Sequence, residues 1–239
     1  MITRYLFSFV RSKRFKGWFN AINILGLSLG IAACLFLTHY VVYHLRYDAH
    51  IPNVDNIYRI NYSRSSEQGD KVEFASACPI IGPSLLKAFP EVESYGRAFR
   101  FEGVFSNGDI AFREIDAYWA ETNFMNLLGF DLVQGDKSTA LDKPNTVVIS
   151  ESAAKRYFGS ENPMGRIIDY NKRLKLEVTG VYRDQQPNTH LHAEVLASFP
   201  TYAASMPDYV MTGWIYSGFY TYVKLREGTA YEEVQKRIP

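Results

Sequence analysis

The feature that most constrains this chain is a run of 25 residues, 21–45, that contains no Asp, Glu, Lys or Arg. An α-helix of that length extends about 37 Å, more than the roughly 30 Å hydrocarbon core of a bilayer. A tryptophan precedes the run and three tyrosines lie near its other end, where membrane–water interfaces favour these residues. The sequence therefore predicts a transmembrane helix at 21–45, followed by a water-soluble domain at 46–239.

Charges on the two sides of the run predict its orientation. Residues 1–20 contain five Lys or Arg residues and no acid, and the first carboxylate of the chain is Asp48. Cytoplasmic flanks of membrane helices are enriched in such cations, so we expect the N-terminus in the cytoplasm and the domain outside it. Apolar residues recur with helical spacing in the leader at 1–20, which predicts an amphipathic helix lying on anionic membrane lipid; a frayed basic leader is the alternative.

Two other interpretations of the apolar run stay open, a cleaved signal peptide and a lipoprotein signal ending at Cys34. Both are less favoured, because the run is longer than the apolar core of a signal peptide and stays apolar after the cysteine. Within the run, Gly26, Gly30 and Ala33 form a stripe of small residues, which would let a second membrane helix approach closely. We therefore expect these three residues to be helix-packing positions.

Apolar and polar residues alternate after residue 46 in a way that predicts strands interspersed with short helices. Asn107-Gly108 between two such runs is typical of a β-hairpin, because both residues tolerate the positive φ of a tight turn. The fold class is therefore α+β, with one N-terminal transmembrane helix followed by a mixed α/β extracytoplasmic domain of two lobes, at 47–135 and 136–230. Strands are predicted at 57–63, 72–76, 95–105, 110–119, 146–149, 174–182, 193–199 and 219–225, and helices at 81–89, 123–128, 151–158 and from 231 onward.

The clearest local pattern is a strand followed directly by a helix. Residues 146–149 are an apolar run typical of a buried strand, and Ser150 is suited to cap the helix that follows. Gly159 is expected to end that helix with a positive φ. Because a strand, a cap and a helix in immediate succession normally pack together, we expect Phe158 to be buried against this strand and its neighbour around 178–181.

Motifs of catalysis and cofactor binding are absent from the sequence. The chain has no phosphate-binding loop of the GxxxxGK[ST] type, no CxxC, no HExxH and no GxSxG, so we expect neither ATP hydrolysis by this chain nor a bound cofactor. His190 and His192 could face a metal from one strand, but a surface turn is favoured because no further Cys or His lies nearby. Cys34 lies in the predicted membrane helix and Cys78 outside it, so we expect no disulfide.

The overall charge is nearly balanced, with 26 Lys+Arg against 25 Asp+Glu and a formal net charge of +1. Proteins that bind nucleic acid usually carry a strong basic excess, so this composition argues against a nucleic-acid partner. The 17 tyrosines and 16 phenylalanines are therefore expected in the core and in interfaces.

Five stretches of the chain carry a recognisable family pattern: 28–34, 50–60, 145–165, 178–191 and 220–225. In their order and spacing they resemble the FtsX-like permeases of ABC transporters, specifically the MacB type with its periplasmic core domain, in the style of Bacteroidetes. The positions that match the family's motifs are expected to be structural; they are Ser150, Glu151, Tyr157, Phe158, Gly159, Gly165, Gly180 and Asp184.

The resemblance implies a permease subunit in the bacterial inner membrane, with its main domain in the periplasm. It also implies a separate cytoplasmic ABC ATPase, a homo- or heterodimer of permeases, and export or mechanical transmission as the function. Family members continue into further membrane helices, so we expect the chain to be truncated before them. A single-pass, membrane-anchored protein that binds or senses an extracytoplasmic ligand is the alternative.

Overall fold

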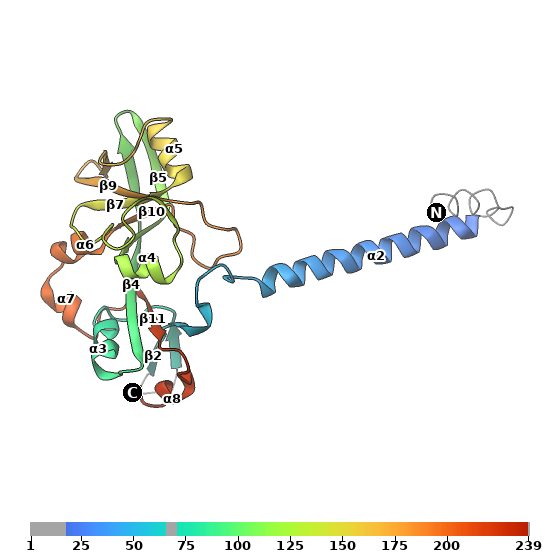
Figure 1. Ribbon diagram of the computed structural model, residues 1–239, viewed down its shortest axis with the longest axis horizontal. Helices are drawn as coiled ribbons and strands as arrows, with labels where there is room; N and C mark the ends of the chain where they lie inside the picture. Colours follow the sequence, from blue (N-terminus) through green and yellow to red (C-terminus); the bar gives the residue numbers. More distant parts are fainter. Residues whose placement is uncertain (1–17, 66–70, 239) are drawn as a thin grey trace. The chain divides into compact units, whose positions relative to one another are not determined.

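A computed structural model describes residues 18–65 and 71–238 (Figure 1). The chain divides into two compact units, Met1–Tyr47 and Asp48–Pro239, and the division falls two residues beyond the predicted end of the membrane helix. Most of the leader at 1–20, for which an amphipathic helix is predicted, lies outside the described residues.

The first unit contains the long helix α2 (Trp18–Leu45). Within the described residues, its segment Asn20–Leu45 is the one helix long and apolar enough to cross a membrane, with a mean hydropathy of 2.1. Apolar side chains are exposed all around it, as expected for a helix whose surroundings are lipid. This confirms the predicted apolar helix, which ends at Leu45 as expected.

The second unit is built on one mixed sheet of nine strands, with the order β1-β11-β4-β5-β10-β7-β9-β6 and β8 paired with β4 and β9. The pairs β5–β10 and β7–β9 are parallel and the other pairs are antiparallel. A separate hairpin pairs β2 with β3. The strands are β1 (Ile57–Arg59), β2 (Tyr62–Ser65), β3 (Lys71–Phe74), β4 (Val92–Asn107), β5 (Ile110–Ala120), β6 (Leu132–Gly135), β7 (Thr146–Ser150), β8 (Ile167–Tyr170), β9 (Leu174–Tyr182), β10 (Val195–Ser198) and β11 (Phe219–Leu225).

Short helices connect these strands, and the predicted helices at 81–89, 123–128, 151–158 and 231 onward are confirmed. Three further helices, η2, α6 and α7, lie where none was predicted. The helices of the second unit are η2 (Val54–Asn56, a 3-10 helix), α3 (Ile81–Ala88), α4 (Thr122–Leu127), α5 (Glu151–Phe158), α6 (Phe199–Ser205), α7 (Asp208–Thr212) and α8 (Tyr231–Gln235).

The boundary predicted between the lobes 47–135 and 136–230 does not divide the sheet. β11 lies between β1 and β4, and β6 lies at the other end of the sheet beside β9, so strands from the two ranges are interleaved. The physical reason is that the long hairpin β4–β5 offers both of its outer edges for pairing, and later strands return to fill them. The hairpin is confirmed, but its two turn residues are Gly108 and Asp109. Gly108 has a φ of 60°, whereas Asn107 is the last residue of β4, pairs with Ile110 and does not have the expected positive φ.

Alternation along the strands sends side chains into a core on each face of the sheet. In β7, Val148 belongs to the cluster that contains the residues of α4, whereas Val147 and Ile149 belong to the cluster that contains those of α5 and α6. Phe158 is 6% exposed and lies in the second cluster together with Val178 of β9. The expected burial of Phe158 is therefore confirmed.

Candidate functional site

The first residue of the second unit, Asp48, is the centre of a hydrogen-bond network. Its carboxylate accepts hydrogen bonds from the Thr189 hydroxyl, from the His190 backbone N–H and from His190 Nδ1, each at 2.9 Å. Its own backbone N–H donates to the Asn188 carbonyl at 2.9 Å. A left-handed φ of 59° at Asp48 turns the chain into this position.

The network continues from His190 to the sheet, because His190 Nε2 lies 2.6 Å from the hydroxyl of Tyr222. When Nδ1–H donates to the Asp48 carboxylate, Nε2 accepts a hydrogen bond from the Tyr222 hydroxyl. Tyr222 belongs to β11 and is 4% exposed, and burial raises its pKa to about 12 although Arg59 opposes the shift. We call Asp48, Thr189, His190 and Tyr222 the Asp48 hub.

Electrostatics favour the charged form of Asp48. Burial of the carboxylate raises its pKa, but the hydrogen bonds from His190 and Thr189 outweigh that effect, so the pKa lies below the ordinary value of 3.8. The hub therefore holds the start of the domain against the loop at 188–190 and against β11 through an ionised acceptor.

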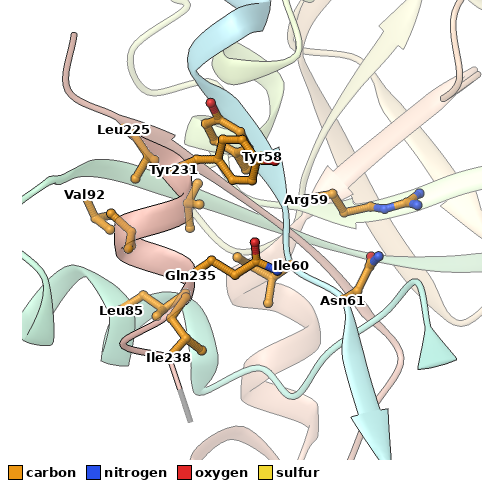
Figure 2. A pocket seen from close by; sticks show the side chains of 12 residues that line it. Tyr58, Arg59, Ile60, Asn61, Leu85, Val92, Leu225, Tyr231, Gln235 and Ile238 are labelled. Atoms are coloured by element: carbon orange, nitrogen blue, oxygen red, sulfur yellow. The ribbon is translucent and has the colours of Figure 1, made fainter. Parts of the chain in front are cut away.

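A groove of about 430 Å³ lies beside the same edge of the sheet, between β1, α3 and α8. Tyr58 of β1 stacks on Tyr231 of α8, with ring centroids 5.3 Å apart and planes inclined by 25°. Figure 2 shows these two rings together, with Arg59 extending to the opposite side of β1. Arg59 lines the pocket that adjoins the hub. Two consecutive side chains of β1 therefore have different surroundings: Tyr58 lies against α8, and Arg59 lies next to the hub.

These contacts join the start of the domain to its last described helix. Arg59 is paired with Tyr222 in the antiparallel register of β1 and β11, and β11 pairs in turn with β4. Tyr222 of β11 is therefore bonded to His190 of the hub and lies opposite Arg59 of β1, so a displacement of Asp48 would reach β11 through His190. Such an arrangement is suited to passing a force from one chain segment to another.

Metal binding finds no support in this part of the chain. The described residues contain no group of three His, Cys, Asp or Glu side chains arranged to hold a metal ion. The hydrogen bonds of His190 go to Asp48 and Tyr222, and His192 is exposed. Cys34 and Cys78 are both free thiols, as expected.

The predicted motif residues around α5 form its caps. The Ser150 hydroxyl accepts a hydrogen bond from the Ala153 N–H at 3.0 Å, as predicted. Asp184, from the segment after β9, accepts hydrogen bonds from the N–H and the hydroxyl of Ser152 at 3.0 and 2.6 Å. Glu151 is exposed in the first turn, where its charge complements the helix dipole. Asp184 therefore acts as a second N-terminal partner of α5.

The predicted glycines and Tyr157 also have defined structural roles. Gly159 and Gly165 have left-handed φ angles of 63° and 74°. Gly180 lies where β9 packs closely, because a Cβ there would be 3.0 Å from the Leu132 side chain. The Tyr157 ring is fully buried in the core.

The sequence analysis missed the polar partners of Tyr157. Its hydroxyl donates to Glu114 of β5 at 2.5 Å, and Arg156 donates to the same carboxylate at 2.7 Å. Arg156 also lies 2.7 Å from Glu194. A carboxylate in the predicted hairpin was visible in the sequence, but its burial was not, because that depends on α5 packing across it.

Gly26, Gly30 and Ala33 all lie on α2. A Cβ added at Gly26 or Gly30 would have no atom of the described residues within 4 Å. The predicted packing of a second helix against this stripe stays a prediction.

Comparison with known proteins decides the family. The family model of the MacB-like periplasmic core domain matches residues 20–239. The chain belongs to this family. Over 87 residues it is 36% identical to the macrolide export ATP-binding/permease protein MacB of Aggregatibacter actinomycetemcomitans; the match covers 35% of this chain and spans 13% of the length of that protein.

Solved structures share the fold of this MacB-like periplasmic core domain. A domain of a putative permease protein from Porphyromonas gingivalis aligns with a TM-score of 0.68 at 22% identity, over 78% of this chain and 79% of that one. The periplasmic region of MacB from Actinobacillus actinomycetemcomitans aligns with a TM-score of 0.56 at 20% identity, over 79% and 82%. The extracellular domain of YknZ, a noncanonic ABC-type transporter from Gram-positive bacteria, aligns with a TM-score of 0.52 at 15% identity. This alignment covers 76% of this chain and 88% of that one.

Proposed function

We propose that this chain is the permease part of an ABC transporter, and that it carries movement of its membrane helix into the periplasmic core domain. ATP hydrolysis would belong to a separate cytoplasmic ABC ATPase, and two permeases would pair as a homo- or heterodimer. The work done by the movement would be export or mechanical transmission. Family membership supports the permease assignment, and the name of the curated relative MacB supports the association with ATP.

The Asp48 hub is the observation that carries the mechanical part of this proposal. Asp48 is the first residue of the domain, and only two residues, Arg46 and Tyr47, separate it from Leu45 at the end of the apolar helix α2. So short a connection leaves little slack, since an extended residue spans at most about 3.6 Å. The hub then distributes a pull on Asp48 to the loop at 188–190 and to β11.

Orientation in the inner membrane is the second part of the proposal. The five cations before the apolar run support a cytoplasmic N-terminus with the domain in the periplasm. A reporter enzyme that is active only in the periplasm, fused after Pro239, should be active in cells. Activity of a reporter that works only in the cytoplasm at the same position would reverse the orientation.

Partner identity is tested by purifying the tagged full-length permease from its own host under mild detergent. We expect an ABC ATPase to copurify and its ATP hydrolysis to depend on the permease. His190→Ala should lower that dependence, whereas His192→Ala, an exposed neighbour, should not. Normal hydrolysis in a correctly folded His190→Ala variant would contradict the role of the hub, and absence of any ATPase would contradict the transporter assignment.

A further inference from the structure

A second cavity, of about 450 Å³, shares no lining residue with the groove or with the pocket at the Asp48 hub. Its wall includes three aromatic side chains, Trp119 of β5, Tyr170 of β8 and Tyr202 of α6. Asn145 and Arg173, from the loops before β7 and β9, are exposed at its rim. Mostly apolar cavities of this size with a few polar groups are typical of small-molecule sites.

The aromatic wall contains an unused hydrogen-bond donor. Trp119 is 7% exposed; its ring stacks on Phe101 at 4.4 Å and meets the edge of Tyr170 at 5.9 Å. The indole N–H makes no hydrogen bond to the residues that the structure describes, and its nitrogen is not among the enclosed polar atoms that lack a partner, so it is open to solvent. An acceptor atom of a ligand in this cavity would complete its hydrogen bonding.

The rim supplies polar groups that are likewise unused. Neither the Arg173 guanidinium nor the Asn145 side-chain amide makes a hydrogen bond or an ion pair with the described part of the chain. Asn145, Asn171 and Lys172 have φ angles of 61°, 51° and 55°; the last two belong to the tight turn that joins β8 to β9 and holds Arg173 at the rim.

We propose that this cavity binds a small organic anion, a carboxylate attached to an apolar body. The apolar body would lie against Tyr170 and Tyr202, while the carboxylate would accept hydrogen bonds from the Arg173 guanidinium and the Trp119 indole. A charged acceptor is favoured over a neutral one, because the guanidinium has no carboxylate partner among the described residues. The proposal goes beyond the permease function and does not depend on it.

Benzoate tests the proposal, with benzamide as an uncharged probe of nearly the same shape. Binding of each is measured by isothermal titration calorimetry to the full chain in lipid nanodiscs, with empty nanodiscs as the blank. We expect saturable binding of benzoate, and binding of benzamide that is about 10- to 100-fold weaker, because a hydrogen bond to a charged group is lost. Arg173→Gln should weaken benzoate binding by a similar factor.

Two variants serve as controls and keep the test falsifiable. Arg183→Gln removes another exposed arginine, which lies 3.6 Å from Asp131 and outside the cavity, and should leave benzoate binding unchanged. Trp119→Phe keeps an aromatic ring without the N–H and should weaken benzoate more than benzamide. Absence of saturable benzoate binding, equal binding of the two probes, or unchanged binding in a folded Arg173→Gln variant would each overturn the proposal.

Discussion

Removing the Phe158 side chain should be one of the costliest single changes to the periplasmic core domain. Phe158 is 6% exposed and packs in the same cluster as Val147, Ile149 and Val178. Emptying a buried aromatic site costs about 3–5 kcal/mol, so Phe158→Ala should lower the free energy of unfolding by that amount. For a unit the size of Asp48–Pro239, this corresponds to a fall in melting temperature of roughly 6–20 °C.

Thermal melts of the full chain in nanodiscs, followed by near-ultraviolet circular dichroism, measure this effect, because the signal reports the packed aromatic core. Lys155→Ala, on the exposed face of the same helix, is the matched control and should change the melting temperature little. If Phe158→Ala had the same melting temperature as the control, burial of Phe158 would not stabilise the domain, and the packing of α5 against β7 described above would be contradicted.

The remaining predictions concern hydrogen bonds and the membrane anchor. Because the pKa of Asp48 is lowered in the fold, its charge stabilises the domain above about pH 3.8, and this stabilisation is lost as the pH falls through the folded pKa. In urea titrations, the difference in the free energy of unfolding between wild type and Asp48→Asn should therefore become smaller as the pH is lowered. Tyr157→Phe should lower the free energy of unfolding by about 1.5–3 kcal/mol in the same assay, because the hydrogen bond to Glu114 is lost. Cys34→Ala should leave membrane association and apparent mass unchanged, and loss of metabolic lipid labelling in this variant would instead indicate a lipoprotein.

Local structure was predictable where neighbouring residues determine it. The cap at Ser150, the end of α5 at Gly159 and the presence of the β4–β5 hairpin each depend on a few consecutive residues, and all three were predicted, although the turn lies one residue later than expected. The helices α6 and α7 were not predicted; they have seven and five residues and no side-chain caps, but α4 and α8 share these features and were predicted, so neither feature explains the difference.

Long-range pairing was not predictable from one sequence. The strand order depends on which edges of the β4–β5 hairpin β10 and β11 occupy, and no local pattern encodes that choice. The hub illustrates the same limit, since Asp48 and His190 are 142 positions apart. His190 was noticed as a metal candidate, but its hydrogen bonds to Asp48 and Tyr222 required the fold to be known.

The most direct test is whether α2 moves relative to the domain when the proposed partner ATPase binds nucleotide. Spin labels at Tyr43 on α2 and Lys155 on α5, both exposed, report that distance by pulsed electron paramagnetic resonance in a background that lacks the two native cysteines. The account predicts that a non-hydrolysable ATP analogue shifts the distance distribution, and that His190→Ala abolishes or broadens the shift while His192→Ala preserves it. Identical distributions with and without nucleotide, or a shift unaffected by His190→Ala, would contradict it.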